Sequence, residues 1–178
     1  IRRACRYRAK DGMVVYTNTP AVRAYREERI REILEKHPND CLTCPKTNGH
    51  CQLQEVTHLF DINPPVRNVP ARGLDDSSPA MVRDMDKCIA CGRCVNVCND
   101  VQKIGIYEMK YDPVTGDRYV NTKKGVKLTE TDCINCGQCA KVCPVAAITE
   151  KGDIRKVMDA LDDPKTTVVW QMAPAIQN

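Results

Sequence analysis

The sequence predicts an α+β protein built of small lobes, and not a single domain around one large apolar core. Only 42% of the 178 residues are hydrophobic and 4% are aromatic, which is a lean supply for one core. Eleven of the twelve cysteines are gathered in three short groups. Segment 88–98 also recurs 45 residues later as segment 133–143, with the same residue at seven of eleven positions. Such a repeat predicts a duplicated half-domain.

The cysteine spacing indicates iron-sulfur clusters. Two groups read C-x2-C-x2-C-x3-C, a run in which three cysteines hold one cube and the fourth reaches the other. The remaining group has three cysteines, and His37 lies one short loop before it, whereas His50 abuts a cysteine and His58 lies downstream. We therefore expect His37 to complete that set. The expected sets are His37, Cys41, Cys44 and Cys51 for the first cluster, Cys88, Cys91, Cys94 and Cys143 for the second, and Cys133, Cys136, Cys139 and Cys98 for the third.

Two other uses of cysteine fit the sequence less well. Disulfides are typical of small secreted domains, whereas this longer chain repeats the short C-x2-C loop three times. Zinc ribbons use paired C-x2-C motifs and leave the third regular cysteine of each quartet unexplained. A zinc-binding interaction or nucleic-acid module stays as the distant alternative, which metal analysis separates from an iron-sulfur protein.

The first half of the chain is predicted from local patterns. Met13–Thr17 has the composition of a strand, and Thr19-Pro20 predicts a helix start with threonine as the N-cap. That helix is expected to end before His37-Pro38. Residues 61–80 are rich in proline, as is typical of a connection between lobes.

The second half adds a hairpin and a helix. Residues 106–111 and 118–122 flank a turn-rich stretch, which predicts a hairpin inserted between the two copies of the repeat. An amphipathic helix with Asp153 as its cap is expected from the spacing of Ile154, Val157, Met158 and Leu161. The cubes should be shielded by Ile89, Val95, Ile134, Val142, Val145, Ala147 and Ile148. The predicted segments are 1–18, a His/Cys cluster lobe at 19–62, a linker at 63–80, a two-cluster ferredoxin-like domain at 81–152, and 153–178.

Charge and hydropathy exclude several functions. The formal charge of +4 suggests nucleic-acid binding, but three cubanes on these ligands add about −5 and bring the loaded protein near neutrality. No stretch reaches the ~18 apolar residues of a membrane span, and residues 1–20 lack the apolar core of a signal peptide. Because cubanes are lost on oxidation, we expect a cytoplasmic protein of a low-oxygen organism, with the hydrogenosome as the alternative.

The chain resembles the electron-relay region of modular FeFe hydrogenases of the electron-bifurcating, NAD(P)-linked type. The resemblance covers nearly all of it and rests on both quartets and on Gly12–Thr17, His37–Cys51, Gln52–Gln54, Thr149–Lys151 and Val168–Ile176. It implies that residues 1–18 are the end of an upstream 2Fe-2S domain, with Cys5 as the last ligand and its three partners before residue 1. It also implies that residues 153–178 are a helix and a strand leading toward a catalytic domain.

The resemblance implies a function without a catalytic side chain in this segment. Three 4Fe-4S clusters, with a 2Fe-2S cluster in the longer parent, would pass electrons between a flavin/NAD(P)-binding iron-sulfur subunit or ferredoxin and a hydrogen-activating site. The alternative is the equivalent subunit of a formate dehydrogenase, a complex I-like assembly or another bifurcating complex, because these share the histidine-ligated motif. Two full quartets speak against complex I, whose subunit usually has one at this place.

Overall fold

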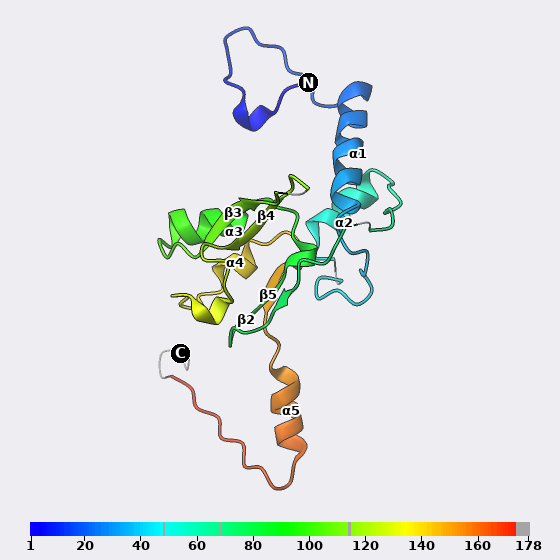
Figure 1. Ribbon diagram of the computed structural model, residues 1–178. Coiled ribbons are helices and arrows are strands. Elements are labelled where there is room, and N and C mark those ends of the chain that lie inside the picture. The colour runs from blue at the N-terminus through cyan, green and yellow to red at the C-terminus, as the bar shows by residue number, and fades with distance from the viewer. Residues whose placement is uncertain (48, 68, 114, 174–178) are drawn as a thin grey trace.

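The computed structural model describes residues 1–47, 49–67, 69–113 and 115–173. Figure 1 shows a central part of short strands and helices, with a tail before α1 and another after β5 that extend away from it. Within the described ranges, no helix has the length and apolar character needed to cross a bilayer. The α+β class predicted from the sequence is confirmed.

The first long helix forms where it was predicted. α1 spans Pro20–Leu34, and the Thr19 hydroxyl accepts a hydrogen bond from the Val22 amide at 3.3 Å. α2 spans Gln52–Leu59 and begins directly after Cys51. The two helices meet residues from the end of the second quartet in a buried cluster that we call the joining core: Ile30, Leu34, Leu53, Ile62, Val145 and Ala147. The joining core therefore packs the first cysteine group against the second half of the chain.

The strand predicted at Met13–Thr17 is wrong. The chain before α1 contains one short 3-10 turn, η1 (Ala4–Arg6), and residues 13–17 are irregular, with Val14 and Tyr16 largely exposed. A strand needs a hydrogen-bonded neighbour, and the two sheets of the described chain are formed by other segments. Composition alone therefore misled the prediction here.

Two small antiparallel sheets frame the cysteine quartets. β1 (Leu74–Asp75), β2 (Met81–Asp84) and β5 (Ile148–Glu150) form one sheet in the order β1-β2-β5. The predicted hairpin is confirmed as β3 (Tyr107–Tyr111) and β4 (Arg118–Thr122), with residue 114 of its turn outside the described residues. Because β1 lies inside 63–80, part of that connecting segment is tied to the ferredoxin-like region by strand pairing.

The duplication is visible in the backbone. Ala90 and Asn135 have φ of 53° and 55°, and Gly92 and Gly137 have φ of 77° and 72°. After each glycine a one-turn helix follows, α3 (Arg93–Asn96) and α4 (Gln138–Lys141). The copies then diverge. A π-helical turn, η3 (Val97–Val101), continues α3, whereas Pro144 lacks the N–H that a continued helix would need.

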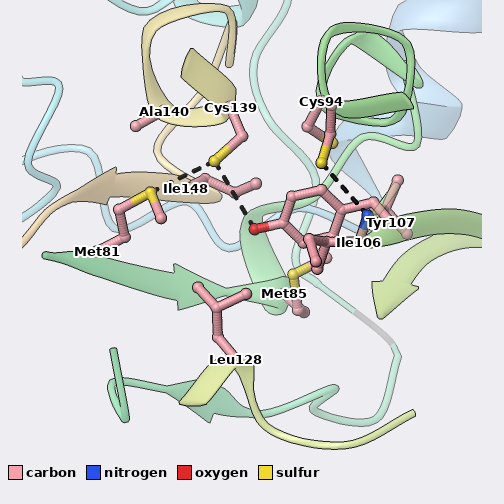
Figure 2. Close-up of a cluster of buried hydrophobic side chains, with 11 residues drawn as sticks. Met81, Met85, Cys94, Ile106, Tyr107, Leu128, Cys139, Ala140 and Ile148 are labelled. Carbon is pink, nitrogen blue, oxygen red and sulfur yellow. Dashed lines mark hydrogen bonds between the residues drawn. The ribbon is translucent and has the colours of Figure 1, made fainter. Parts of the chain in front are cut away.

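A second buried cluster lies between the sheets and the quartets, and we call it the ferredoxin core. It consists of Met81, Met85, Cys94, Cys98, Ile106, Tyr107, Val120, Leu128, Cys139, Ala140 and Ile148. Two 3-10 turns, η2 (Met85–Lys87) and η4 (Leu128–Glu130), contribute to it. Figure 2 shows these side chains around Tyr107 and Cys139. Ile134 was expected to shield a cube but is 66% exposed.

The helix after β5 forms as predicted, without the predicted cap. α5 spans Ile154–Asp162, but the Asp153 carboxylate accepts a hydrogen bond from Lys156 Nζ at 2.6 Å and caps no backbone amide. Residues 163–173 contain no strand, and the end of the expected strand, residues 174–178, lies outside the described residues. The apolar face of α5 is exposed.

Candidate cluster-binding sites

Three neighbouring cysteines and a fourth that is distant in the sequence line one small cavity. Cys88, Cys91 and Cys94 come from α3 and the loop before it, and Cys143 comes from the end of the second copy. The other lining residues are glycine, proline and apolar side chains, with no charged group among them. The structure thus brings together the set predicted for the second cluster. Burial, and then the thiols of Cys88, Cys143 and Cys91, raise the pKa of Cys94 to about 12.

This cavity fits a cubane chemically. Thiolates in an apolar pocket are poorly solvated and also repel one another, which is why the pKa of Cys94 is high. Iron supplies the positive charge that stabilises thiolate over thiol. Gly92 takes the left-handed conformation at the start of α3, and the side chain nearest to its missing Cβ is Met109, at 3.5 Å.

The third predicted set gathers around α4. Burial raises the pKa of Cys139, and the nearby thiols of Cys133 and Cys136 add to the rise. Cys98 lies in the ferredoxin core with Cys139, and its Sγ accepts a hydrogen bond from the Ile106 amide at 3.4 Å. The structure therefore places the distal cysteine of the first copy beside the residues of the second.

Three of the four members of the first predicted set line a different cavity. His37 is 8% exposed and lines this cavity with Cys41 and Cys51. Its Nε2 is buried and has no hydrogen-bond partner among the described residues. Burial also lowers the pKa of His37, which favours the neutral imidazole that binds metals. An unpaired buried nitrogen is costly, and an iron at this position would satisfy it.

The thiols of this set lie near one another as well. Burial raises the pKa of Cys41, and the neighbouring thiols of Cys51 and Cys44 raise it further. His58 lines the same cavity but is exposed, and His50 lies in a separate hollow beside Cys136. Cys5 is exposed in η1.

Replacing His37 with alanine is expected to remove one cubane and leave the other two, because His37 is the buried imidazole with an unpaired nitrogen. The measurement is iron content together with EPR of the reduced protein. His58→Ala is the matched control, since that side chain lines the same cavity from an exposed position. Equal iron contents in the two variants would contradict the assignment.

Each predicted set has one ligand at the surface. Cys41, Cys91 and Cys136 are exposed, and the other ligands are half-buried or buried. Within the described ranges, no three His, Cys, Asp or Glu side chains converge on a point where one metal ion would fit. Cubane ligands surround four irons and each binds a different one, so they need not converge.

Three polar side chains near the sites were missed by the sequence reasoning. Lys87 is buried, and its Nζ lies 3.1 Å from Asp40 and 2.9 Å from Asp84, which ties the first cysteine loop to β2. Tyr107 and Arg83 lie beside the third set in the ferredoxin core. Of these three residues, only Lys87 had a signal in the sequence, namely its position directly before the predicted ligand Cys88.

Two sequence-family models match the chain. Residues 87–147 match the 4Fe-4S dicluster domain, which spans both quartets and the hairpin between them. These residues form a 4Fe-4S dicluster domain. Residues 26–65, which contain His37, Cys41, Cys44 and Cys51, match the NADH-ubiquinone oxidoreductase-G iron-sulfur binding region.

Relatives of this chain include oxidoreductases. NADP-reducing hydrogenase subunit HndD of Solidesulfovibrio fructosivorans is 38% identical over 98% of this chain and 30% of its own length. A putative formate dehydrogenase of Staphylococcus haemolyticus is 32% identical over 84% of this chain and 15% of its own length. The chain therefore spans less than a third of either relative. The crystal structure of an NAD+-reducing NiFe-hydrogenase in the H2-reduced state shares the fold, with a TM-score of 0.76 at 21% identity over 85% of this chain and 64% of that chain.

Proposed function

We propose that this chain is the electron-relay section of an FeFe hydrogenase of the electron-bifurcating, NAD(P)-linked type. The similarity to an NADP-reducing hydrogenase subunit over nearly the whole chain supports this proposal. The relay would connect a flavin/NAD(P)-binding iron-sulfur subunit, or ferredoxin, with a downstream hydrogen-activating domain. When bound, the clusters supply one-electron transfer, and the chain supplies their positions and surroundings.

The observation that carries the proposal is that ligands of neighbouring sets pack against the same buried cores. Cys51 of the first set packs on the joining core together with Cys88 and Cys143 of the second. Cys88 and Cys143 also pack on the ferredoxin core, which contains Cys98 and Cys139 of the third. The second predicted set therefore adjoins the first through the joining core and the third through the ferredoxin core.

Direct hydrogen bonds reinforce the contact between the first and second sets. The Gln52 amide, next to Cys51, donates to the Pro144 carbonyl at 3.0 Å. Lys46 Nζ donates to the carbonyl of Cys143 at 2.6 Å. The chain thus holds the first loop against the backbone of the distal ligand of the second set. Rigid positioning of this kind would keep the electron-tunnelling distance between the first and second clusters short and constant.

Anaerobically prepared protein is expected to contain about twelve irons and about as many acid-labile sulfides per chain, and to show cubane EPR signals on reduction. Cys5→Ser is the control, because Cys5 lies outside the three sets and should leave the iron content unchanged. A colourless protein with two or three zinc ions would contradict the relay and support the zinc module.

A formate dehydrogenase subunit is the second candidate, favoured by the similarity to the Staphylococcus protein. The two candidates differ in the substrate that reduces the clusters. The full-length protein that contains this chain should be reduced by H2 and not by formate if the hydrogenase proposal is correct. Reduction by formate alone would replace it with the second candidate.

A further inference from the structure

The Tyr107 hydroxyl donates a hydrogen bond to the sulfur of a predicted cluster ligand. Tyr107 is the first residue of β3 and is 1% exposed. Its hydroxyl lies 3.7 Å from Cys139 Sγ, and Figure 2 shows the two side chains pointing toward each other. Both residues lie in the ferredoxin core, so water does not compete for this hydrogen bond. The hydroxyl is thus a fixed donor at the third site.

A buried cation lies over the ring of this tyrosine. The Arg83 guanidinium is 5.4 Å from the ring centroid of Tyr107. Arg83 is held in place by the Asp75 carboxylate at 3.1 Å and by the Asn121 side-chain oxygen at 3.3 Å. A cation on the ring face draws electron density from the phenol and makes its O–H a stronger donor. The guanidinium therefore strengthens the hydrogen bond that Tyr107 donates to Cys139.

The second site offers no equivalent side chain. Cys94 stands at the position of the repeat that corresponds to Cys139, 45 residues earlier. The cavity beside Cys94 is lined by apolar residues, and among the described residues no side-chain N–H or O–H donates to a sulfur of the second set. Backbone donors occur at both sites, from Ala90 to Cys88 and from Ile106 to Cys98, each at 3.4 Å.

The difference between the two sites comes from the hairpin. Tyr107 belongs to β3, which follows the first copy of the repeat, and no hairpin follows the second copy before β5. One-electron reduction of a cubane adds one negative charge and breaks no covalent bond. A donor on a ligating sulfur interacts more strongly with the more negative state and so favours reduction. Apolar surroundings without a side-chain donor, as at the second site, disfavour reduction.

We propose that Tyr107, supported by Arg83, makes the third cluster easier to reduce than the second, so that the inserted hairpin sets a downhill electron step between two duplicated sites. Tyr107 does not bind iron; it acts through the hydrogen bond from its hydroxyl to Cys139 Sγ. The inference rests on the proposed relay function, because it requires cubanes at both sites.

The test is an EPR-monitored redox titration of the full chain, prepared anaerobically and reduced with dithionite. Tyr107→Phe keeps the ring under Arg83 and removes only the hydroxyl. The EPR signal of the third cluster is identified as the one that Cys136→Ser perturbs. In Tyr107→Phe, the midpoint potential of that signal is expected to become more negative. At fixed potential the ratio of reduced to oxidised third cluster should fall by about fivefold, the factor that one ordinary hydrogen bond represents.

The control is Tyr111→Phe, at the other end of β3, where the side chain is 68% exposed. This variant should leave every potential unchanged. Full iron content with an unchanged third-cluster potential in Tyr107→Phe would overturn the inference while leaving the relay intact. Absence of cubane signals from the unmodified chain would instead overturn the relay.

A second measurement covers the case in which Tyr107→Phe binds less iron. Replacement of all tyrosines by 3-fluorotyrosine makes each phenol a stronger donor and keeps its shape. The third-cluster potential should then rise, and the second-cluster potential should stay in place. A third-cluster potential that does not rise would overturn the inference.

Discussion

Cys143→Ala is expected to remove the intact second cubane and spare the third, although Cys143 belongs to the same sequence run as the third-cluster cysteines. The reason is geometric, because Cys143 lines the cavity of Cys88, Cys91 and Cys94. Loss of this ligand leaves three thiolates around the cube, so iron content should fall by between one and four irons, to a three-iron cluster or to none. The EPR signal that Cys91→Ser perturbs should disappear.

Cys98→Ala is the matched control for that experiment, since Cys98 occupies the same position in the first copy of the repeat. This variant should remove the third-cluster signal and keep the second. If each alanine variant instead lost the cluster of its own sequence run, ligation would be local and the crossed arrangement would be wrong. Both variants need anaerobic handling, because partly ligated clusters degrade in air.

Arg83→Met is expected to destabilise the fold by about 3–5 kcal/mol, because it leaves the largely buried Asp75 carboxylate without its cationic partner. Arg83 is 2% exposed and lies 3.1 Å from Asp75. Burial works to raise the pKa of Asp75, but hydrogen bonds from Ser77 and the Leu128 amide and the charge of Arg83 hold it below its usual value. The measurement is the urea midpoint of the far-UV circular dichroism signal under anaerobic conditions.

Arg155→Met is the control for charge and size. The Arg155 side chain is 90% exposed, and its pair with Asp159 at 3.6 Å should contribute less than about 1 kcal/mol. Equal urea midpoints for the two variants would show that the Arg83 pair adds nothing to stability. A lower midpoint for Arg83→Met alone, with the same slope, would confirm the prediction.

Local features were predictable from the sequence. The Thr19 cap and the two strands of the hairpin depend on neighbours a few residues away. The repeat was also predictable, because seven of its eleven positions are identical, and Ala90 and Asn135 adopt the same rare conformation at equivalent places. The crossed grouping of Cys143 with the first quartet was predictable as well, since it follows from the reach of the quartet around a cube.

Features that depend on tertiary contacts were not predictable. Nothing in the sequence pairs Tyr107 with Cys139 or Lys87 with Asp40, because these contacts form only when the lobes pack. The strand expected at residues 13–17 failed for the same reason, since strand-like composition does not supply a neighbour. The exposure of Ile134 shows that an apolar residue next to a predicted ligand need not be buried.

The surface position of one ligand in every set has a consequence for how the protein is damaged. Dioxygen or a chelator can reach the exposed Cys41, Cys91 and Cys136 independently, so each predicted cluster would be open to attack on its own. Oxidative damage should therefore begin at several exposed cysteines in parallel. Electron transfer along the chain would stop as soon as any one of the three predicted clusters is lost. Any partner surface that covers these three cysteines would lengthen the working life of the whole chain in air.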